Sequence, residues 1–285
     1  MNNILVTGAN GLLGNEFREQ LDLNNNYFSS RQDCDITDID SIRKYVSNKK
    51  IDIILNCAAN RNAEAMQNDY NAAHKITVCG PKNLAIVANE IGAKLIHFSS
   101  DYVFDGKKSS PYEETDKTNG LSVYGKLKIE GEQEVLNIAN NALIIRTAWL
   151  FSYYGQDFVK TIKKLAETKD EINVIYDQVG SPCYASDLAK YTIEILPKIK
   201  SNSREIYHLT NEGVCSWYDL AYQIVKSFNI PCKINPIHTN EFPQKAPRPS
   251  YSVLDKTKVK AHFGINIRHY SEGLDDCIKR IKGIE

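Results

Sequence analysis

The chain has 285 residues, of which 42% are hydrophobic and 25% charged, and its 35 basic residues balance 35 acidic ones. This is the composition of a soluble globular protein with one large or two modest domains, and the absence of a basic excess argues against nucleic acid or an anionic membrane as the main partner. No apolar run reaches 18 residues and the N-terminus has no apolar leader, so we expect neither a membrane span nor a signal peptide.

The seven cysteines are scattered and include no Cys-x-x-Cys pair. This spacing predicts neither a metal site nor a disulfide framework. It favours a protein of the reducing cytoplasm.

The chain begins with a short apolar strand at residues 3–7, followed at once by a glycine-rich turn and a helix that we expect to reach about Leu23. Glycines at this spacing allow a tight turn and let the backbone approach a pyrophosphate, while the helix N-terminus supplies free N–H groups. The turn therefore predicts a dinucleotide site, with Gly8, Asn10, Gly11, Leu12, Leu13 and Gly14 at the cofactor.

A second strand is predicted at residues 27–30, and polar residues follow it where such folds recognise the adenosine ribose. Arg31 favours the 2′-phosphate of NADPH, whereas Asp33 and Asp35 allow NADH. Arg31 is equally compatible with a solvated loop, so the cofactor is NADPH or NADH at this point.

Strands and helices then alternate, which predicts an α/β fold with a Rossmann-type, doubly wound parallel sheet. The small residues Cys57, Ala58 and Ala59 end one strand and would let a cofactor lie close to the backbone. The predicted elements are a helix at 38–48, a strand at 51–56, helix at 64–91 with a break near Gly80-Pro81, a strand at 94–99, a helix from 124, a strand at 142–147, a helix at 156–168 and a strand at 172–175.

The chemistry is predicted between Ser99 and Lys128. Ser100 and Asp101 follow a buried strand, at the sheet edge where open α/β sheets bind ligands. Tyr124 and Lys128 are four residues apart in a predicted helix and so share one face. A nearby ammonium lowers the pKa of a phenol, and together with Ser100 this pair can protonate an oxygen that gains charge during hydride transfer.

After Thr147 the pattern becomes irregular and predicts a smaller, mixed α/β C-terminal domain that caps the crevice. We predict a Rossmann domain at 1–147, with later sheet strands from about 170–195, and a substrate-binding cap at 148–285 that is interleaved with it. Helices are expected at 187–196 and, behind a Ser216/Asp219 capping box, at 217–228. Arg248 lies in a proline-stiffened loop, where it could meet a phosphate with both guanidinium N–H groups.

These motifs together resemble the extended short-chain dehydrogenase/reductases and, within them, the dTDP-4-dehydrorhamnose reductase family. The resemblance covers nearly the whole chain and rests on the Gly8/Gly11/Gly14 turn, Asp35-Ile36, Asn56-Cys-Ala-Ala59, Ser99-Ser-Asp-Tyr-Val-Phe-Asp-Gly106, Tyr124-Gly-Lys-Leu-Lys128, Arg146-Thr-Ala-Trp149, Asp177-Gln-Val-Gly-Ser-Pro182 and Arg248-Pro-x-x-Ser252. It implies reduction of the C4 ketone of dTDP-4-dehydro-L-rhamnose to dTDP-L-rhamnose with NADPH or NADH, in the synthesis of cell-surface polysaccharide.

The resemblance also implies roles for residues. Tyr124 would be the general acid, Lys128 would tune it and bind the nicotinamide ribose, and Ser100 stands where the family usually has threonine. The cofactor positions would include Asp35, Ile36 and Ala59, and those for the nucleotide sugar would be Ser100, Asp101, Tyr102, Tyr124, Trp149 and Arg248. The protein would act as a monomer or homodimer.

Three departures from the family pattern leave the sugar open. Residues 60–64 read Asn-Arg-Asn-Ala-Glu where the family usually has Tyr-Thr-x-Val-Asp, Thr77 replaces asparagine, and Cys183 replaces threonine. Arg61 would favour a more acidic or differently substituted sugar. The alternatives are a reductase or epimerase of another nucleotide sugar, or a non-catalytic regulatory homologue of the same fold.

Overall fold

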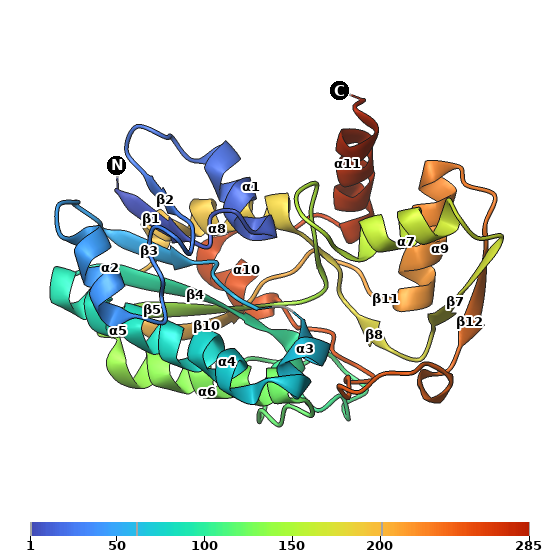
Figure 1. The fold of residues 1–285 in the computed structure, drawn as a ribbon, viewed down its shortest axis with the longest axis horizontal. Helices are drawn as coiled ribbons and strands as arrows, with labels where there is room; N and C mark the ends of the chain where they lie inside the picture. The colour runs from blue at the N-terminus through green and yellow to red at the C-terminus, as the bar shows by residue number, and fades with distance from the viewer. Residues whose placement is uncertain (1, 61, 201, 285) are drawn as a thin grey trace.

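The computed structural model describes residues 2–60, 62–200 and 202–284. At its centre is a parallel sheet of six strands in the order β2-β1-β3-β4-β5-β10 (Figure 1). The strands are β1 (Ile4–Thr7), β2 (Tyr27–Ser29), β3 (Ile53–Asn56), β4 (Lys94–Ser100), β5 (Ala142–Thr147) and β10 (Arg204–His208). The predicted Rossmann-type α/β fold is therefore confirmed.

The strand order reverses at β1, which has β2 on one side and β3 on the other. Thr7 is in register with both Ser29 and Asn56, so the three strands end at the same level. An open α/β sheet binds its ligand outside the carboxyl ends of the strands at such a switch point. The glycine turn after β1 and the Cys57–Ala59 segment after β3 both begin there.

The sixth strand of the sheet is a correction to the sequence prediction. We expected later sheet strands from about 170–195, but β10 is Arg204–His208, whereas β7 (Glu171–Ile175) pairs with β12 (Lys233–Ile237) outside the sheet. β7 lies outside the central sheet because only one of its faces is buried. Glu171 and Asn173 of β7 are exposed while Ile172 and Val174 are buried, an alternation typical of a strand with one solvated face.

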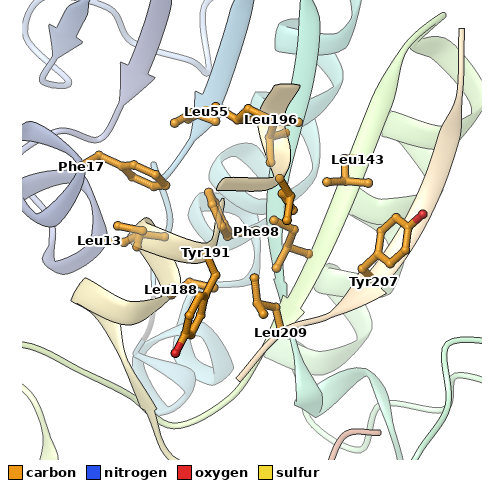
Figure 2. Packing of buried hydrophobic residues seen from close by; sticks show 14 of the residues in the cluster. Leu13, Phe17, Leu55, Phe98, Leu143, Leu188, Tyr191, Leu196, Tyr207 and Leu209 are labelled. Carbon is orange, nitrogen blue, oxygen red and sulfur yellow. The ribbon is translucent and has the colours of Figure 1, made fainter. Parts of the chain in front are cut away.

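Helices cover both faces of the sheet, as the β-α alternation predicts. One face packs against α1 (Leu12–Gln20), α8 (Ala185–Ile195) and α10 (Thr257–Phe263), and the other against α2 (Ile39–Val46), α5 (Gly80–Ile91) and α6 (Val123–Ile138). Figure 2 shows the first of these cores, where Phe17 of α1 and Leu188 of α8 converge on Phe98 of β4. This packing fixes α1, and with it the glycine turn, against the sheet.

A second lobe lies beside the carboxyl edge of the sheet (Figure 1). Its core is formed by α7 (Phe158–Ala166), α9 (Trp217–Phe228), α11 (Tyr270–Lys282) and the β7-β12 pair. Two further strand pairs are β6 (Leu150–Phe151) with β9 (Cys183–Tyr184) and β8 (Val179–Gly180) with β11 (Cys215–Ser216). The predicted Ser216/Asp219 capping box is present at the start of α9. Because β10 belongs to the sheet and α8 and α10 pack against it, the two lobes are interleaved in sequence.

The predicted helix at 64–91 is built from four segments. These are α3 (Ala63–Asn68), α4 (Tyr70–His74), a π-helical segment (Lys75–Cys79) and α5. The helix is irregular before Gly80-Pro81, in the π-helical segment, and not at the proline itself. Pro81 stands in the first turn of α5, where its missing N–H costs no helical hydrogen bond. No helix within residues 2–60, 62–200 and 202–284 is long and apolar enough to cross a membrane.

Candidate active site

Two adjoining cavities lie along the carboxyl edge of the sheet. The first, of about 580 Å³, runs from Arg31 past the glycine turn to Ala59, and the second, of about 450 Å³, runs from the turn to Tyr124 and Arg248. They share Gly11, Cys57 and Ala59, so together they form one trough. Of the described residues that the sequence predicts at the cofactor or the sugar, all but Gly14 and Asp33 line this trough.

The glycine turn leaves no room for side chains. Gly8 has a φ of +64°, and a Cβ there would lie 2.6 Å from Ala58 Cα. A Cβ on Gly14 would lie 2.4 Å from the carbonyl oxygen of Gly8, so Gly14 packs beneath the turn instead of facing the ligand. The glycines thus bring main chain close to the trough.

The start of α1 also fits a phosphate group. Its N-cap is Gly11, which has no side chain to accept a hydrogen bond from the first turn. The N–H groups of the first turn of a helix have no partner within the helix and carry partial positive charge. Because Gly11, Leu12 and Leu13 line the trough, these donors suit a dinucleotide pyrophosphate.

The far end of the first cavity carries exposed charge. Arg31 Nε donates to Asp35 Oδ2 at 3.2 Å, and the Arg31 side chain is 74% exposed. The Asp35 carboxylate also accepts hydrogen bonds from the N–H and hydroxyl of Thr37. These hydrogen bonds and the arginine hold the pKa of Asp35 below its usual value in spite of partial burial. To contact a phosphate, Arg31 would have to leave this exposed ion pair with Asp35.

Tyr124 and Lys128 face the second cavity from α6, as their spacing predicts. Lys128 is buried, and its Nζ donates to the carbonyl oxygen of Phe98 at 3.0 Å and lies 6.0 Å from the centre of the Tyr124 ring. Burial lowers the pKa of Lys128 to about 8, while the negative charge of Glu132 acts in the opposite direction. The buried amine thus lies beside the phenol at the cavity wall.

Ser100 is the last residue of β4, Asp101 follows it, and both line the same cavity. Ser100 Oγ donates to Asp101 Oδ1 at 2.9 Å and accepts a hydrogen bond from the N–H of Tyr102 at 3.2 Å. Both side chains are buried, with exposed fractions of 6% and 2%. Burial raises the pKa of Asp101 to about 6. The Tyr102 ring meets the Tyr124 ring edge-on, with centroids 5.6 Å apart.

Trp149 contributes to the wall in a conformation that the sequence does not reveal. Its φ is +45°, in the left-handed region that non-glycine residues rarely adopt. Its ring stacks on Trp217 of α9 with centroids 3.5 Å apart, and it packs so closely on Gly180 that a Cβ there would lie 2.5 Å from the ring. The stack joins the second lobe to the trough and gives the cavity an apolar boundary.

Arg248 faces the same cavity from a loop that is fixed on both sides. Before it, the carboxylate of Glu64 accepts hydrogen bonds from the N–H groups of Lys245 and Ala246, and after it Ser250 Oγ donates to the carbonyl oxygen of Gly106. Arg248 Nε is buried and has no hydrogen-bond partner among the described residues. Its positive charge lowers the pKa of Tyr102, although burial has the larger, opposite effect.

A buried ion pair behind Lys128 is absent from the sequence prediction. Arg146 Nε and Nη2 donate to the two carboxylate oxygens of Glu132 at 2.9 and 2.7 Å, and both side chains are almost fully buried. The signal was available, because Tyr124, Lys128 and Glu132 follow each other at four-residue intervals on one helix face. Trp217, which lines the second cavity, is a further residue that the sequence prediction missed.

The departures from the family pattern differ in their distance from the trough. Asn60, Asn62, Ala63 and Glu64 line it, whereas Cys183 is buried in the core under the sheet. Thr77 lies in the π-helical segment, and its carbonyl oxygen packs against Gly131 of α6. Arg61, which we expected to affect the choice of sugar, lies outside the described residues. The 60–64 segment therefore remains the departure that bears on the ligand.

The glycine turn at residues 8–14, hereafter the glycine cradle, lies at the switch point of a parallel sheet, and a tyrosine and a lysine one helical turn apart lie beside it. This combination defines a nicotinamide-dependent oxidoreductase of the short-chain dehydrogenase/reductase class. The model of the family described as the RmlD substrate binding domain matches residues 1–282. The chain belongs to this family.

Individual relatives agree over the full length. The dTDP-4-dehydrorhamnose reductase of Aggregatibacter actinomycetemcomitans is 37% identical, with 95% of this chain and 100% of that protein covered. The crystal structure of a dTDP-4-dehydrorhamnose reductase from Clostridium acetobutylicum is 39% identical with a TM-score of 0.93, covering 98% of this chain and 99% of that one. The Bacillus anthracis reductase, solved in complex with NADP, has 32% identity, a TM-score of 0.93 and the same coverage.

Proposed function

We propose that this protein reduces the C4 ketone of dTDP-4-dehydro-L-rhamnose to the alcohol of dTDP-L-rhamnose with NADPH or NADH. The observation that carries the proposal is the convergence of Ser100, Tyr124 and Lys128 on one cavity that adjoins the glycine cradle. Relatives at 37–39% identity bear the name of this reductase, and one relative was solved with NADP. The product would serve the synthesis of cell-surface polysaccharide.

When bound along the trough, the reduced nicotinamide supplies a hydride to the ketone carbon. Tyr124 gives its phenolic proton to the oxygen that gains negative charge. Lys128, held by the Phe98 carbonyl, favours transfer of that proton because its charge stabilises the phenolate left behind. Ser100 provides a hydrogen bond to the same oxygen, and hydrogen-bond donors in a site of little water stabilise a developing oxyanion strongly.

The remaining residues hold the nucleotide sugar. Arg248, whose Nε has no hydrogen-bond partner among the described residues, lies in a loop fixed by Glu64 and Gly106. It suits the diphosphate, since arginine can give two parallel hydrogen bonds to phosphate. The Trp149–Trp217 stack closes the cavity with apolar surface and keeps water from the reacting carbon. Asp101 and Tyr102 border the sugar position.

The test is Tyr124→Phe, assayed by NADPH consumption with dTDP-4-dehydro-L-rhamnose. Loss of a general acid lowers kcat by about 10²- to 10⁴-fold. NADPH affinity, measured by fluorescence titration, should stay within about twofold, since the glycine cradle is intact. Tyr45→Phe, on the outer helix α2, is the matched control and should keep full activity. Full activity in Tyr124→Phe would refute the assignment.

A second candidate is the reduction or epimerisation of another nucleotide sugar by the same residues. The divergent 60–64 segment supports it, because Asn60, Asn62, Ala63 and Glu64 line the trough. A panel of nucleoside-diphosphate 4-keto sugars, with product analysis, separates the two candidates by their kcat/KM values. A protein that turns over none of them and co-purifies tightly with a partner enzyme would be the non-catalytic homologue.

We further propose a cytoplasmic enzyme that is a monomer or homodimer. All seven cysteines have free thiols, in keeping with a reducing compartment. Light scattering on the purified protein would measure the oligomeric state, and thiol titration of protein taken directly from cells would detect any disulfide.

A further inference from the structure

The hydrogen bond between Ser100 and Asp101 affects what Ser100 can offer a ligand. A serine hydroxyl has one hydrogen to donate, and an ionised carboxylate can only accept. Ser100 Oγ lies 2.9 Å from Asp101 Oδ1 and is itself an acceptor for the Tyr102 N–H. With Asp101 ionised, the single Ser100 hydrogen is therefore held by the carboxylate, and Ser100 presents only lone pairs to the cavity.

A ketone oxygen also has only lone pairs, so it gains nothing from a Ser100 in that state. If Asp101 is neutral, with its proton on Oδ1, the direction of the hydrogen bond reverses. The carboxyl then donates to Ser100 Oγ, and the Ser100 hydrogen is free for the ligand. The same two atoms at the same distance thus give either a donor or an acceptor at the cavity wall.

We propose that Asp101 is a positioning residue that acts through Ser100: its neutral carboxyl turns Ser100 into a donor for the ketone oxygen, and its charged form turns Ser100 into an acceptor for the product hydroxyl. This inference rests on the proposed reductase function. It assigns Asp101 a task other than direct contact with the sugar.

The surroundings of Asp101 make both forms accessible. Its side chain is 2% exposed, and Oδ2 is buried without a hydrogen bond of normal geometry among the described residues. Burial raises the pKa of Asp101 to about 6, while Ser252, Ser100 and nearby N–H groups favour the charged form. Asp101 therefore ionises close to neutral pH.

Other charged and titratable groups face the same cavity. Helix α6 contributes Tyr124 and Lys128, the neighbouring residue is Tyr102, and the facing loop contributes Arg248. The carboxylates of Glu64 and Asp157 line the cavity as well. The two cations favour ionised Asp101, whereas the carboxylates of Glu64 and Asp157 and the negative diphosphate of a bound nucleotide sugar favour the neutral form. Binding of the substrate thus opposes the effect of Lys128 and Arg248.

The reduction itself leaves Ser100 and Asp101 with the protons they had. The C4 carbon gains a hydride from the bound nicotinamide, the π pair of the carbonyl moves to oxygen, and that oxygen takes the proton of Tyr124. The product hydroxyl now has a hydrogen to donate. Ser100 can accept it when Asp101 is ionised, so the charged form of Asp101 favours the alcohol.

The first measurement is the pH profile of kcat/KM for reduction of dTDP-4-dehydro-L-rhamnose between pH 5.5 and 8. The wild-type value should fall by at least tenfold as Asp101 ionises. Asp101→Asn carries an amide that donates at every pH, so its profile should lack this fall and change by no more than about twofold, as Lys128 begins to lose its proton near pH 8. Asp105→Asn, the same change four residues along and outside the trough, should follow the wild type.

The second measurement is binding in complexes that cannot react. Calorimetry should find that the ketone, with NADP⁺ present, binds more weakly as pH rises, and that dTDP-L-rhamnose, with NADPH present, binds more tightly. In Asp101→Asn both affinities should be independent of pH. A merely structural role of Asp101 would not produce opposite pH dependences for the ketone and the alcohol in the wild type. In a Ser100→Ala background, Asp101→Asn should leave the pH profile of kcat/KM unchanged, because Asp101 acts through Ser100.

The outcomes separate the two proposals. A wild-type protein that does not reduce the ketone at any pH contradicts the proposed function. A wild-type protein that reduces it with the same pH profile as Asp101→Asn contradicts the role of Asp101 alone. Circular dichroism and NADPH titration of each variant establish that the fold and the cradle are retained.

Discussion

The two ends of the trough present different chemical groups to a ligand. At the end near β1 and β2 the glycine turn brings main chain close to the ligand position, and an exposed Arg31–Asp35 pair lies at the rim. At the end near α6 the surface consists of side chains, and the charges of Lys128, Glu132 and Arg146 are buried.

The difference follows from what each end must do. A pyrophosphate requires N–H donors and close approach, which the backbone supplies whatever the neighbouring side chains are. Proton transfer requires groups whose pKa values are shifted by burial and by neighbouring charges, which only side chains in a fixed interior can provide. The cradle end should therefore be sensitive to added volume, and the reaction end to changes of charge.

The largest expected effect tests the buried charges of the reaction end. Glu132→Gln leaves Arg146 without a counter-ion in the interior, and breaking a buried pair costs about 3–5 kcal/mol of unfolding free energy. Urea denaturation measures it. Glu90→Gln breaks the exposed pair with Arg43 and should cost far less. Equal losses in the two variants would show that burial does not set the reaction end apart.

The second test adds volume to the cradle end. Gly8→Ala and Gly92→Ala both place alanine at a positive φ, +64° and +71°, but a Cβ at Gly8 meets Ala58 at 2.6 Å, while nothing lies within 4 Å of Gly92. Gly92→Ala carries the conformational cost alone, about 1–2 kcal/mol. Gly8→Ala adds an overpacking cost of about 1–3 kcal/mol and should weaken NADPH binding. Similar Tm and Kd values for both variants would contradict the close approach.

The third test concerns the free-energy cost of burying the Lys128 amine. Because the folded pKa of Lys128 is about 8, below its ordinary 10.5, unfolding free energy should rise with pH between about 8 and 10.5, where the unfolded chain still binds the proton. Lys128→Met removes this penalty and should stabilise the protein at pH 7 by about 1–3 kcal/mol, with activity lost. Lys126→Met, exposed on the same helix, should change neither property. A destabilised Lys128→Met protein would be the contrary result.

The smallest effect is expected at the exposed rim. Arg31→Ala removes a solvated cation, and such a contact with a 2′-phosphate should change the NADPH Kd by about two- to fivefold. The Kd for NADH should be unchanged, since NADH has no 2′-phosphate. Fluorescence titration with both cofactors gives the ratio, and an equal loss for both would remove Arg31 as a determinant of cofactor preference.

Some features of this protein follow from its sequence alone. The buried strands, the glycine turn directly after the first of them and the four-residue spacing of Tyr124 and Lys128 predict the sheet, its ligand edge and the helix face of the site. These are local patterns, in which chain neighbours fix the geometry. The cofactor, sugar and catalytic roles of individual residues stay predictions until the experiments above are done.

Other features were decided only by the tertiary structure. Sequence reasoning assigned a sheet strand near 172–175, but the sixth strand is β10, because a short strand can pair with any edge that covers its apolar face. The pairing of Glu132 with Arg146, the stacking of Trp149 on Trp217 and the anchoring of the Arg248 loop by Glu64 each join residues that are distant in the chain. Such contacts depend on how the folded elements pack together, and local sequence patterns carry no record of that packing.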